Sequence, residues 1–229
     1  MAGRPDKGRS LSELRHEYLA ALGIPIWVQR GAEAGPAEAD SSDVSSLEDL
    51  AVEVQACTRC ALHASRNQTV FGVGDTNADL LIIGEAPGAD EDRQGEPFVG
   101  RAGQLLNAML GAIHLARADV YIANILKCRP PSNRDPKPAE AEACTPYLER
   151  QIALIEPKVI LAVGRIAAQW LLQSDQPIGR LRGTVHSYGT ASTPLVASYH
   201  PAYLLRSPLA KAKAWEDLVL VSRILNDPS

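Results

Sequence analysis

The sequence contains no apolar run that approaches the ~18 residues of a membrane-spanning helix. Its first residues, 1–7, are polar and lack the apolar region of a signal peptide. It also shows no internal repeat, and residues 31–45 are its one biased tract. We therefore expect one ordinary soluble domain with an extension, a cytoplasmic location and no membrane partner.

An excess of positive charge is missing too, because the chain carries −4 at pH 7. That balance alone argues against a nucleic-acid partner, but the charges are unevenly placed. Residues 1–56 hold 5 basic and 10 acidic side chains, whereas residues 176–215 hold no acid. The basic residues of that acid-free stretch are Arg180, Arg182, Arg206, Lys211 and Lys213. The stretch predicts a surface that faces phosphates, and the alternative is chance variation on a solvated face.

Cysteine is scarce, and the four residues are Cys57, Cys60, Cys128 and Cys144. In a cytosolic chain with no cysteine left over, this number favours a metal site over disulfides. Cys57 and Cys60 have the C-x-x-C spacing of a metal-binding knuckle, but the later pair completes neither a zinc ribbon nor a ferredoxin motif. Spacing therefore leaves zinc, an iron–sulfur cluster and unrelated thiols open. His16 and His63 are further ligand candidates, although each reads more simply as a surface histidine.

From residue 46 onward, short apolar runs alternate with helical patterns. The predicted strands are 80–83, 120–125, 159–163 and 195–198, with 70–71 as a short strand and 182–187 as an edge strand or hairpin. The predicted helices begin at Ser46 and cover 101–114, 138–156, 165–173 and 208–226. This order predicts an α/β fold with three layers, α/β/α, around a central four-stranded parallel sheet.

Residues 1–45 have a different character and are predicted to form an N-terminal extension to a domain of residues 46–229. Apolar spacing predicts a short helix over 11–22, with Ser10 as its N-cap. Residues 23–28 are apolar and either dock on the core or bind a partner, and residues 31–45 read as a flexible acidic linker. We expect a monomer, with residues 1–30 as the candidate segment for a protein partner.

The stretch that organises the chain is the loop over residues 84–107, which follows the first predicted strand and is rich in glycine, proline and carboxylates. Open α/β folds bind ligands at the carboxyl ends of parallel strands. The other three strands end near Asn124, Gly164 and His200-Pro201. If all four strands are parallel, these residues converge on the loop and form a ligand site. The alternative is a long irregular surface loop.

Four segments resemble family 4 uracil-DNA glycosylases, the iron–sulfur type. They are Gly84-Glu-Ala-Pro-Gly88, the Glu-Asp-Arg-x-Gly-x-Pro-Phe-Val-Gly-Arg-Ala-Gly run of residues 91–103, Asn124-Ile-Leu-Lys-Cys-Arg-Pro-Pro131 and His200-Pro-Ala-Tyr-Leu-Leu-Arg206. The resemblance covers about residues 46–226. It implies a four-stranded parallel sheet between helices and a structural [4Fe–4S] cluster on Cys57, Cys60, Cys128 and Cys144. It also implies a monofunctional enzyme that hydrolyses the N-glycosidic bond of uracil in DNA and so starts base excision repair.

Such an enzyme must flip the nucleotide out of the duplex, stack the base, read its edge and stabilise the leaving anion. Phe98, one of only two phenylalanines in the chain, is the candidate stacking face. Asn124 is the candidate edge reader, because an amide matches uracil N3–H and O4 and mismatches cytosine. His200 is the candidate donor to uracil O2. Gly84 and Ala86 complete the predicted base-binding set.

The group that positions water is left open by the sequence. Glu85 is the first candidate, and a backbone carbonyl at Ala86 or the Asp92 carboxylate are alternatives. In the best-known uracil glycosylases an Asp stands where this chain has Ala86. The residue that acts as general base on water therefore cannot be assigned from those enzymes.

Candidate DNA contacts surround these residues. An apolar side chain at Leu204 or Leu205 is predicted to wedge into the gap left by the flipped base, with Arg206 on a phosphate. Gly88, Gly100 and Arg101 are predicted to face other phosphates. Lys127, Arg129 and Arg134 are predicted to extend this basic surface.

Two alternatives to the glycosylase remain. One is a superfamily relative that traps uracil-DNA covalently, but such relatives carry Gln at the position of Ala86 and a basic, histidine-containing insertion that residues 125–144 lack. The other is a non-catalytic iron–sulfur protein that binds nucleic acid.

Overall fold

The computed structural model describes residues 46–227. The predicted helix over 11–22, the apolar segment 23–28 and the linker 31–45 lie outside the described residues.

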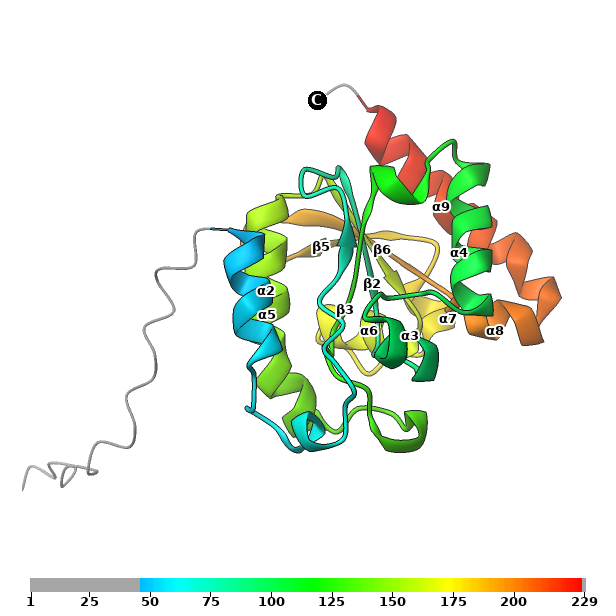
Figure 1. Ribbon diagram of the computed structural model, residues 1–229. Coiled ribbons are helices and arrows are strands. Elements are labelled where there is room, and N and C mark those ends of the chain that lie inside the picture. Colours follow the sequence, from blue (N-terminus) through cyan, green and yellow to red (C-terminus); the bar gives the residue numbers. More distant parts are fainter. Residues whose placement is uncertain (1–45, 228–229) are drawn as a thin grey trace, which may run out of the picture. The chain divides into compact units, whose positions relative to one another are not determined.

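A six-stranded sheet forms the centre of the described domain, in the order β1-β3-β2-β4-β6-β5 (Figure 1). The strands are β1 (Val73–Gly74), β2 (Leu80–Gly84), β3 (Tyr121–Asn124), β4 (Val159–Val163), β5 (Val185–Tyr188) and β6 (Thr193–Ser198). The four inner strands are parallel, which confirms the predicted core of the sheet. Two antiparallel edge strands, β1 and β5, extend it on either side. The first edge strand lies a few residues beyond the predicted 70–71, and the second forms a hairpin with β6.

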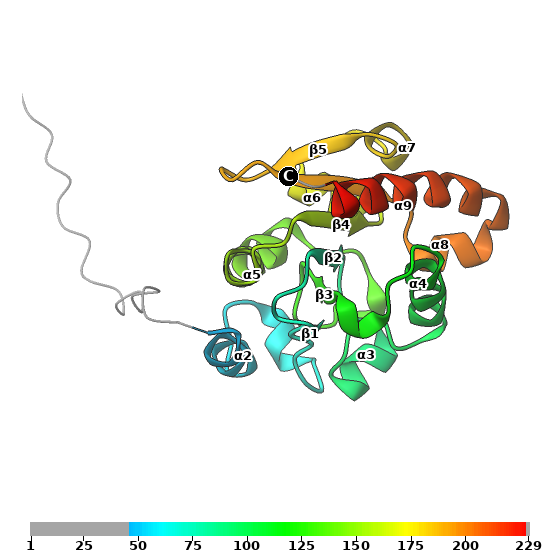
Figure 2. The same cartoon turned by 90° about the horizontal axis from the view of Figure 1, so that it is seen from above.

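Helices cover both faces of the sheet, so the three-layer α/β/α prediction is confirmed (Figure 2). They are α2 (Leu47–Gln55), α3 (Ala89–Gln94), α4 (Arg101–Ala112), α5 (Pro138–Ile155), α6 (Arg165–Leu171), α7 (Ile178–Leu181), α8 (Pro201–Arg206) and α9 (Lys211–Asn226). Short 3₁₀ turns lie at Ala61–Ala64, Arg117–Asp119, Pro131–Asn133 and Pro208–Ala210.

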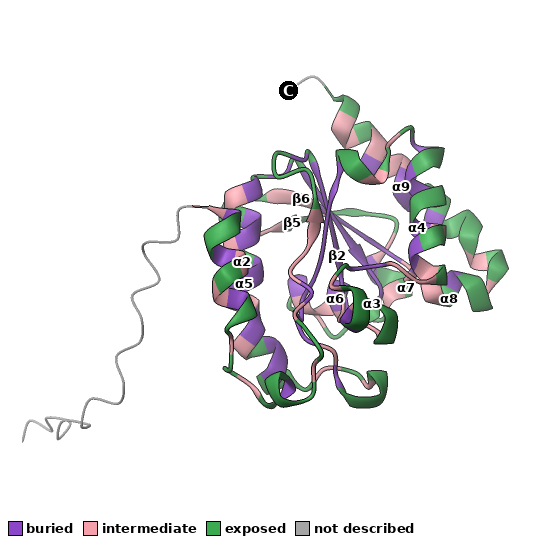
Figure 3. Cartoon of the chain, viewed as in Figure 1, coloured by how far each residue is buried: buried purple, intermediate pink, exposed green. Residues whose placement is uncertain are grey.

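Alternation along the inner strands produces two hydrophobic cores. Leu81 and Ile83 of β2 face the core shared with α2, α5 and α6, whereas Leu80 and Ile82 face the core shared with α4 and α9. Every residue of β2, β3 and β4 is buried, as Figure 3 shows, while the outer helix faces are exposed. Strands buried on both faces read as continuous apolar runs, which is why the sequence located them well.

The strand order places a switch point at β2. Its partner β3 lies on one side and β4 on the other, and both run parallel to it. In open α/β sheets the crevice beyond the carboxyl ends of the strands at such a point is the usual ligand site. The loop after Gly84 therefore begins where the fold leaves room for a ligand.

Two functional helices, α3 and α8, are absent from the sequence prediction. Helix α3 has a single buried side chain, Asp92, so it carries no apolar periodicity. Helix α8 has only six residues, but Pro201 at its first position and His200 as its N-cap are recognisable start signals.

Candidate functional site at the carboxyl edge of the sheet

A cleft of about 500 Å³ lies at the carboxyl ends of the inner strands, a size typical of small-molecule sites. The predicted site residues that line it are Glu85, Ala86, Gly88, Phe98, Asn124, His200 and Arg206. They come from the ends of β2 and β3, the loop before α4, and α8. The predicted convergence of the strand ends is therefore confirmed. Glu91, Asp135 and Tyr203 also line the cleft, and the sequence prediction gave them no role.

Gly84, at the end of β2, has no room for a side chain. A Cβ there would lie 2.4 Å from Asn124 Oδ1 and 2.7 Å from Phe98 Cζ. Real Cβ atoms do not approach other atoms so closely, so the Asn124 amide and the Phe98 ring pack directly on this backbone. Glycine at this position is a packing requirement of the site.

Phe98 is held in a left-handed backbone conformation, with φ 54°. Such a conformation is uncommon for an aromatic residue and persists only where the surroundings impose it. The guanidinium of Arg117 donates to Pro97 O at 2.6 Å and to Phe98 O at 3.4 Å. The backbone of Gly103 also lies so close that a Cβ there would be 1.7 Å from Phe98 O. These contacts fix the ring, which stacks on the His200 ring with centroids 5.5 Å apart.

Asn124 ends β3 and is 2% exposed. Within the described part of the chain, its Oδ1 is buried without a hydrogen-bond partner. A buried polar atom left unpaired costs roughly 1–3 kcal/mol, so it is expected to serve a ligand. Asn124 lines the cleft, and an unpaired acceptor there fits a ligand that carries an N–H donor.

His200 caps the N-terminus of α8. Its Nδ1 accepts the backbone N–H of Ala202 at 3.1 Å, so Nδ1 is unprotonated in this arrangement. Burial, the largest cause, and the Arg206 charge together lower the pKa of His200 to about 4, against the opposing charge of Glu91. The ring is therefore neutral near pH 7, and its single proton is on Nε2. A neutral imidazole in this state is a hydrogen-bond donor and not a cation.

Glu85 follows Gly84 directly and is half-buried. Burial, the largest cause, and the nearby Asp135 charge together raise the pKa of its carboxyl to about 7, against the opposing charge of Arg165. Asp135 and Arg165 themselves form an ion pair at 3.0 Å. Glu85 is therefore poised to exchange a proton near neutral pH, as catalytic acids and bases are.

The predicted DNA-contacting residues divide into two groups. Arg206 lines the cleft, Arg101 is exposed at the start of α4, and Leu205 is 37% exposed. Leu204 is 1% exposed and packs in the core shared with α4 and α9, so the structure corrects its assignment as a wedge. Adjacent side chains of a helix point in different directions. Of the two leucines, Leu205 is therefore the one that reaches the surface.

The predicted basic surface is smaller than the sequence suggested. Lys127 is 1% exposed and faces the interior, where burial lowers its pKa to about 8. Arg134 is committed to Glu140 at 2.5 Å, and Arg129 donates to Asn133 at 2.7 Å. Within the acid-free stretch, Arg182 is paired with Asp217 and Glu216. Lys127 and Arg182 are therefore internal supports, and the assignment of Lys127 to the phosphate-facing surface is wrong.

The anion-binding character of the α4 N-terminus is already used inside the protein. One oxygen of Glu91 accepts Val99 N–H at 3.1 Å and lies 3.5 Å from Gly100 N. The predicted phosphate contact at Gly100 therefore meets a carboxylate from α3. Gly88, the N-cap of α3, lies beside the same carboxylate.

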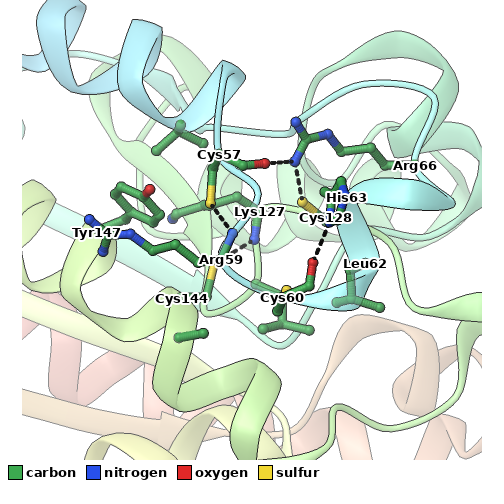
Figure 4. Close-up of a pocket in the computed structure, with 13 residues that line it drawn as sticks. Cys57, Arg59, Cys60, Leu62, His63, Arg66, Lys127, Cys128, Cys144 and Tyr147 are labelled. Carbon is green, nitrogen blue, oxygen red and sulfur yellow. Dashed lines mark hydrogen bonds between the residues drawn. The ribbon is translucent and has the colours of Figure 1, made fainter. Parts of the chain in front are cut away.

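The four cysteines lie together around a second cavity, close to α2 and α5 (Figure 4). All four are free thiols. Backbone and guanidinium N–H groups point at three of the sulfurs: Arg59 N to Cys57 at 3.5 Å, Lys127 N to Cys144 at 3.3 Å, and Arg66 Nη1 to Cys128 at 3.2 Å. Burial raises the pKa of Cys128, and that of Cys144 to about 11. His63 lines the cavity too, but its Nδ1 lies 2.7 Å from Cys60 O, so the ring is turned toward the backbone.

No group of three His, Cys, Asp or Glu side chains among residues 46–227 is arranged to hold a single metal ion. The four thiols instead line one common cavity.

None of the helices described is long and apolar enough to cross a membrane.

The fold and site together define an α/β protein with a cleft of about 500 Å³ at the strand ends and a separate cavity lined by four cysteines. The family model of the Uracil DNA glycosylase superfamily matches residues 71–219. The chain is 43% identical over 187 residues to the type-4 uracil-DNA glycosylase of Archaeoglobus fulgidus, which spans 79% of this chain and 94% of that relative. The type-4 uracil-DNA glycosylase of Pyrobaculum aerophilum is 40% identical, over 78% of this chain and 92% of that relative. The type-4 uracil-DNA glycosylase of Thermotoga maritima is also 40% identical, over 70% of this chain and 84% of that relative. The chain belongs to the type-4 uracil-DNA glycosylase family.

Proposed function

We propose that this protein removes uracil from DNA by hydrolysing its N-glycosidic bond, the first step of base excision repair. The observation that carries the proposal is the buried, unpartnered Oδ1 of Asn124, in one cleft with Phe98, His200 and Glu85. Together these groups supply each function that uracil release needs.

Recognition rests on Asn124 and Phe98. The amide oxygen accepts uracil N3–H, and the amide nitrogen donates to O4. Cytosine carries the opposite pattern at these positions, so both amide groups would stay unpaired in a buried site, which is costly. The Phe98 ring, fixed by its backbone contacts, stacks on the flipped base. Gly84 and Ala86 let the backbone approach the base without side-chain obstruction.

Bond cleavage leaves negative charge on uracil, shared between O2 and N3, and cation character on the sugar. His200 Nε2–H donates to O2 as this charge develops. Because the ring is neutral, it stabilises the anion without first having to lose or gain a proton. The Glu85 carboxylate positions the water that attacks C1′ and favours the cation-like sugar by its charge.

Glu85 gives a pH prediction. Its carboxyl has a raised pKa of about 7, so the active carboxylate is lost as pH falls through 7. We expect the single-turnover rate to rise with pH through a one-proton step near 7. Glu85→Gln should be slower and lose this step. Asp135→Asn, which removes a charge that raises the pKa, should move the midpoint to lower pH. A step that keeps its midpoint in both variants would exclude Glu85.

DNA binding is assigned to the rim of the cleft. Arg206 and Arg101 contact phosphates, the backbone at Gly88 approaches the strand, and Leu205 fills the gap left by the flipped base. Among residues 46–227, neither arginine forms an ion pair with a carboxylate, unlike Arg182 and Arg134.

The cysteine centre fits the [4Fe–4S] cluster implied by the family. The side chains of all four cysteines line one cavity, and four cysteine thiolates are the usual ligand set of a [4Fe–4S] cluster. The N–H groups aimed at Cys57, Cys128 and Cys144 would stabilise thiolate ligands. When bound, the cluster supplies structural cross-linking between the C-x-x-C segment and the β3–α5 region.

Loss of the cluster should therefore destabilise the domain. Anaerobically purified protein is expected to absorb near 400 nm, and Cys144→Ser should lose this absorbance and unfold at a lower temperature in circular dichroism melts. His63→Ala is the matched control, because its ring faces Cys60 O, and it should keep both properties. A colourless wild type with an unchanged melting temperature after chelation would contradict the cluster.

We further propose that residues 1–45 form an extension to the catalytic domain, with residues 1–30 available to a protein partner, and that the protein acts as a cytoplasmic monomer.

The function is tested with an oligonucleotide that carries one uracil, incubated with the protein and then heated in alkali. Strand scission at the uracil position, and none at cytosine or thymine, is expected. Scission before alkali would indicate a lyase, and a protein that shifts the oligonucleotide in a gel without scission would indicate a non-catalytic binder. A panel of deaminated bases in single and double strands would define the substrate range.

A further inference from the structure

Lys127 carries a buried ammonium group that the proposed chemistry does not use. The side chain is 1% exposed, and its Nζ donates to Asn124 O at 2.8 Å and to Gln151 Oε1 at 2.5 Å. Lysine is almost never fully buried unless it is paired. Among residues 46–227, the two oxygens that accept from this ammonium are both neutral, and no carboxylate forms an ion pair with it. An arrangement this costly calls for a specific role.

The second acceptor is itself anchored. Gln151 is 0% exposed, lies on α5, and donates from Nε2 to Phe71 O at 3.0 Å. Lys127, Gln151 and the Phe71 carbonyl thus form a short chain of hydrogen bonds, of which the Lys127–Gln151 bond is buried and the Gln151–Phe71 bond is part-buried. A glutamine held at both ends gives the ammonium a fixed position.

The Lys127 ammonium binds the carboxyl end of β3, at the backbone carbonyl of Asn124. Pairing with β2 runs to Asn124, and the next two N–H groups, of Ile125 and Leu126, still bond Gly84 O and Glu85 O. The Asn124 carbonyl accepts from Lys127 Nζ instead of from a strand. Its side chain has little freedom, because Oδ1 already lies against Gly84 and Phe98.

Lys127 also contacts the cavity lined by the four cysteines. Its backbone N–H points to Cys144 Sγ at 3.3 Å, and the next residue is Cys128 (Figure 4). Lys127 is thus bonded both to the base-reading residue and to a cysteine of the cluster site.

We propose that Lys127 is a positioning residue for uracil recognition, which holds Asn124 in place and couples the iron–sulfur segment to the base-binding cleft. This rests on the proposed function. It assigns to the Lys127–Gln151 pair a specificity role, because a displaced Asn124 amide would lose its fit to the uracil edge while the phosphate contacts on α4 and α8 stay in place.

The test replaces Lys127 with methionine, which keeps the chain length but removes the donor. Lys127→Met is expected to weaken inhibition by free uracil by about 10-fold or more, to lower kcat/KM on uracil-DNA by a similar factor, and to leave the affinity for DNA with an abasic site within 2-fold. Gln151→Met, a milder change, should act in the same direction with a smaller effect. Absorbance near 400 nm and the melting curve report whether the cluster and fold are retained.

Lys158→Met is the matched control, because Lys158 is exposed and its ion-pair partner in the described part of the chain is the exposed Asp79. This variant should match the wild type in every measurement. Equal losses of uracil and abasic-DNA affinity, unchanged uracil inhibition in both variants, or loss of cluster and fold in both, would each overturn the proposal. A wild-type protein that releases no uracil would instead overturn the proposed function, so the two failures are distinguishable.

Discussion

Replacing His200 with alanine is expected to lower the rate of uracil release by about 10²–10³-fold, with little change in DNA affinity. The donor acts on negative charge that appears only as the bond breaks, so its loss affects the transition state far more than the bound substrate. The structure makes this sharper, because Nδ1 is occupied by Ala202 N–H and leaves Nε2–H free for the base. Single-turnover rates and binding to abasic-site DNA measure the two quantities separately.

Arg206→Ala is the matched comparison, since Arg206 lines the same cleft and lies on the helix that His200 caps. It should weaken DNA binding and reduce its salt dependence, with a smaller effect on the rate of the bound complex. The neutral state of His200 has its own signature. With a pKa of about 4, the ring does not titrate between pH 5 and 9, so the rate of a Glu85→Gln variant should be flat over that range. Equal losses of rate and affinity in His200→Ala would make His200 a binding or structural residue.

Asn124→Asp is the second large effect, and it should move the specificity of the cleft toward cytosine. An ionised aspartate offers two acceptors to uracil O4 and N3–H, so one contact becomes repulsive and uracil release should fall by roughly 10–100-fold. The site is buried, and burial favours the protonated carboxyl. A protonated aspartate donates to cytosine N3 and accepts from N4–H, a pattern that matches cytosine.

Cytosine release is measured on an oligonucleotide with a single cytosine, again by alkaline scission. Asn133→Asp, at the exposed rim of the same cleft, introduces the same charge away from the base and should keep the uracil preference. If Asn124→Asp still releases only uracil at the wild-type rate, Asn124 does not read the base edge.

The sequence located the inner strands because they are buried on both faces, and β4 was predicted to the residue. The edge strands were harder, since β1 has two residues and β5 is largely exposed. Helix α3 was missed for a related reason: it carries acidic side chains around one buried aspartate, and an apolar pattern cannot report it. Motifs led to Glu85, Phe98, Asn124 and His200 and to the four cysteines, which the structure brings together in a cleft and a cavity.

The contact partners of individual side chains, and the directions in which those side chains point, could not be predicted from the sequence. Nothing in the composition distinguishes Leu204, which packs in the core, from Leu205, which reaches solvent. Lys127 reads as one more basic residue beside a cysteine until the fold turns its side chain inward. The unusual backbone of Phe98 arises from Gly103 and Arg117, and Arg117 lies outside the organising loop. Each of these depends on tertiary contacts that local patterns do not encode.

The raised pKa of Glu85 also has a consequence for folding. The carboxyl binds its proton more tightly in the native state, where its pKa is about 7, than in the unfolded chain, where the ordinary pKa of 4.5 applies. Where the native state holds more protons than the unfolded chain, stability falls as pH rises. The contribution of Glu85 is therefore complete below pH 4.5 and is lost as pH rises through 7. The carboxylate that the proposed reaction uses forms over the pH range in which Glu85 stops stabilising the fold, so activity and the contribution of this residue to stability follow opposite trends with pH.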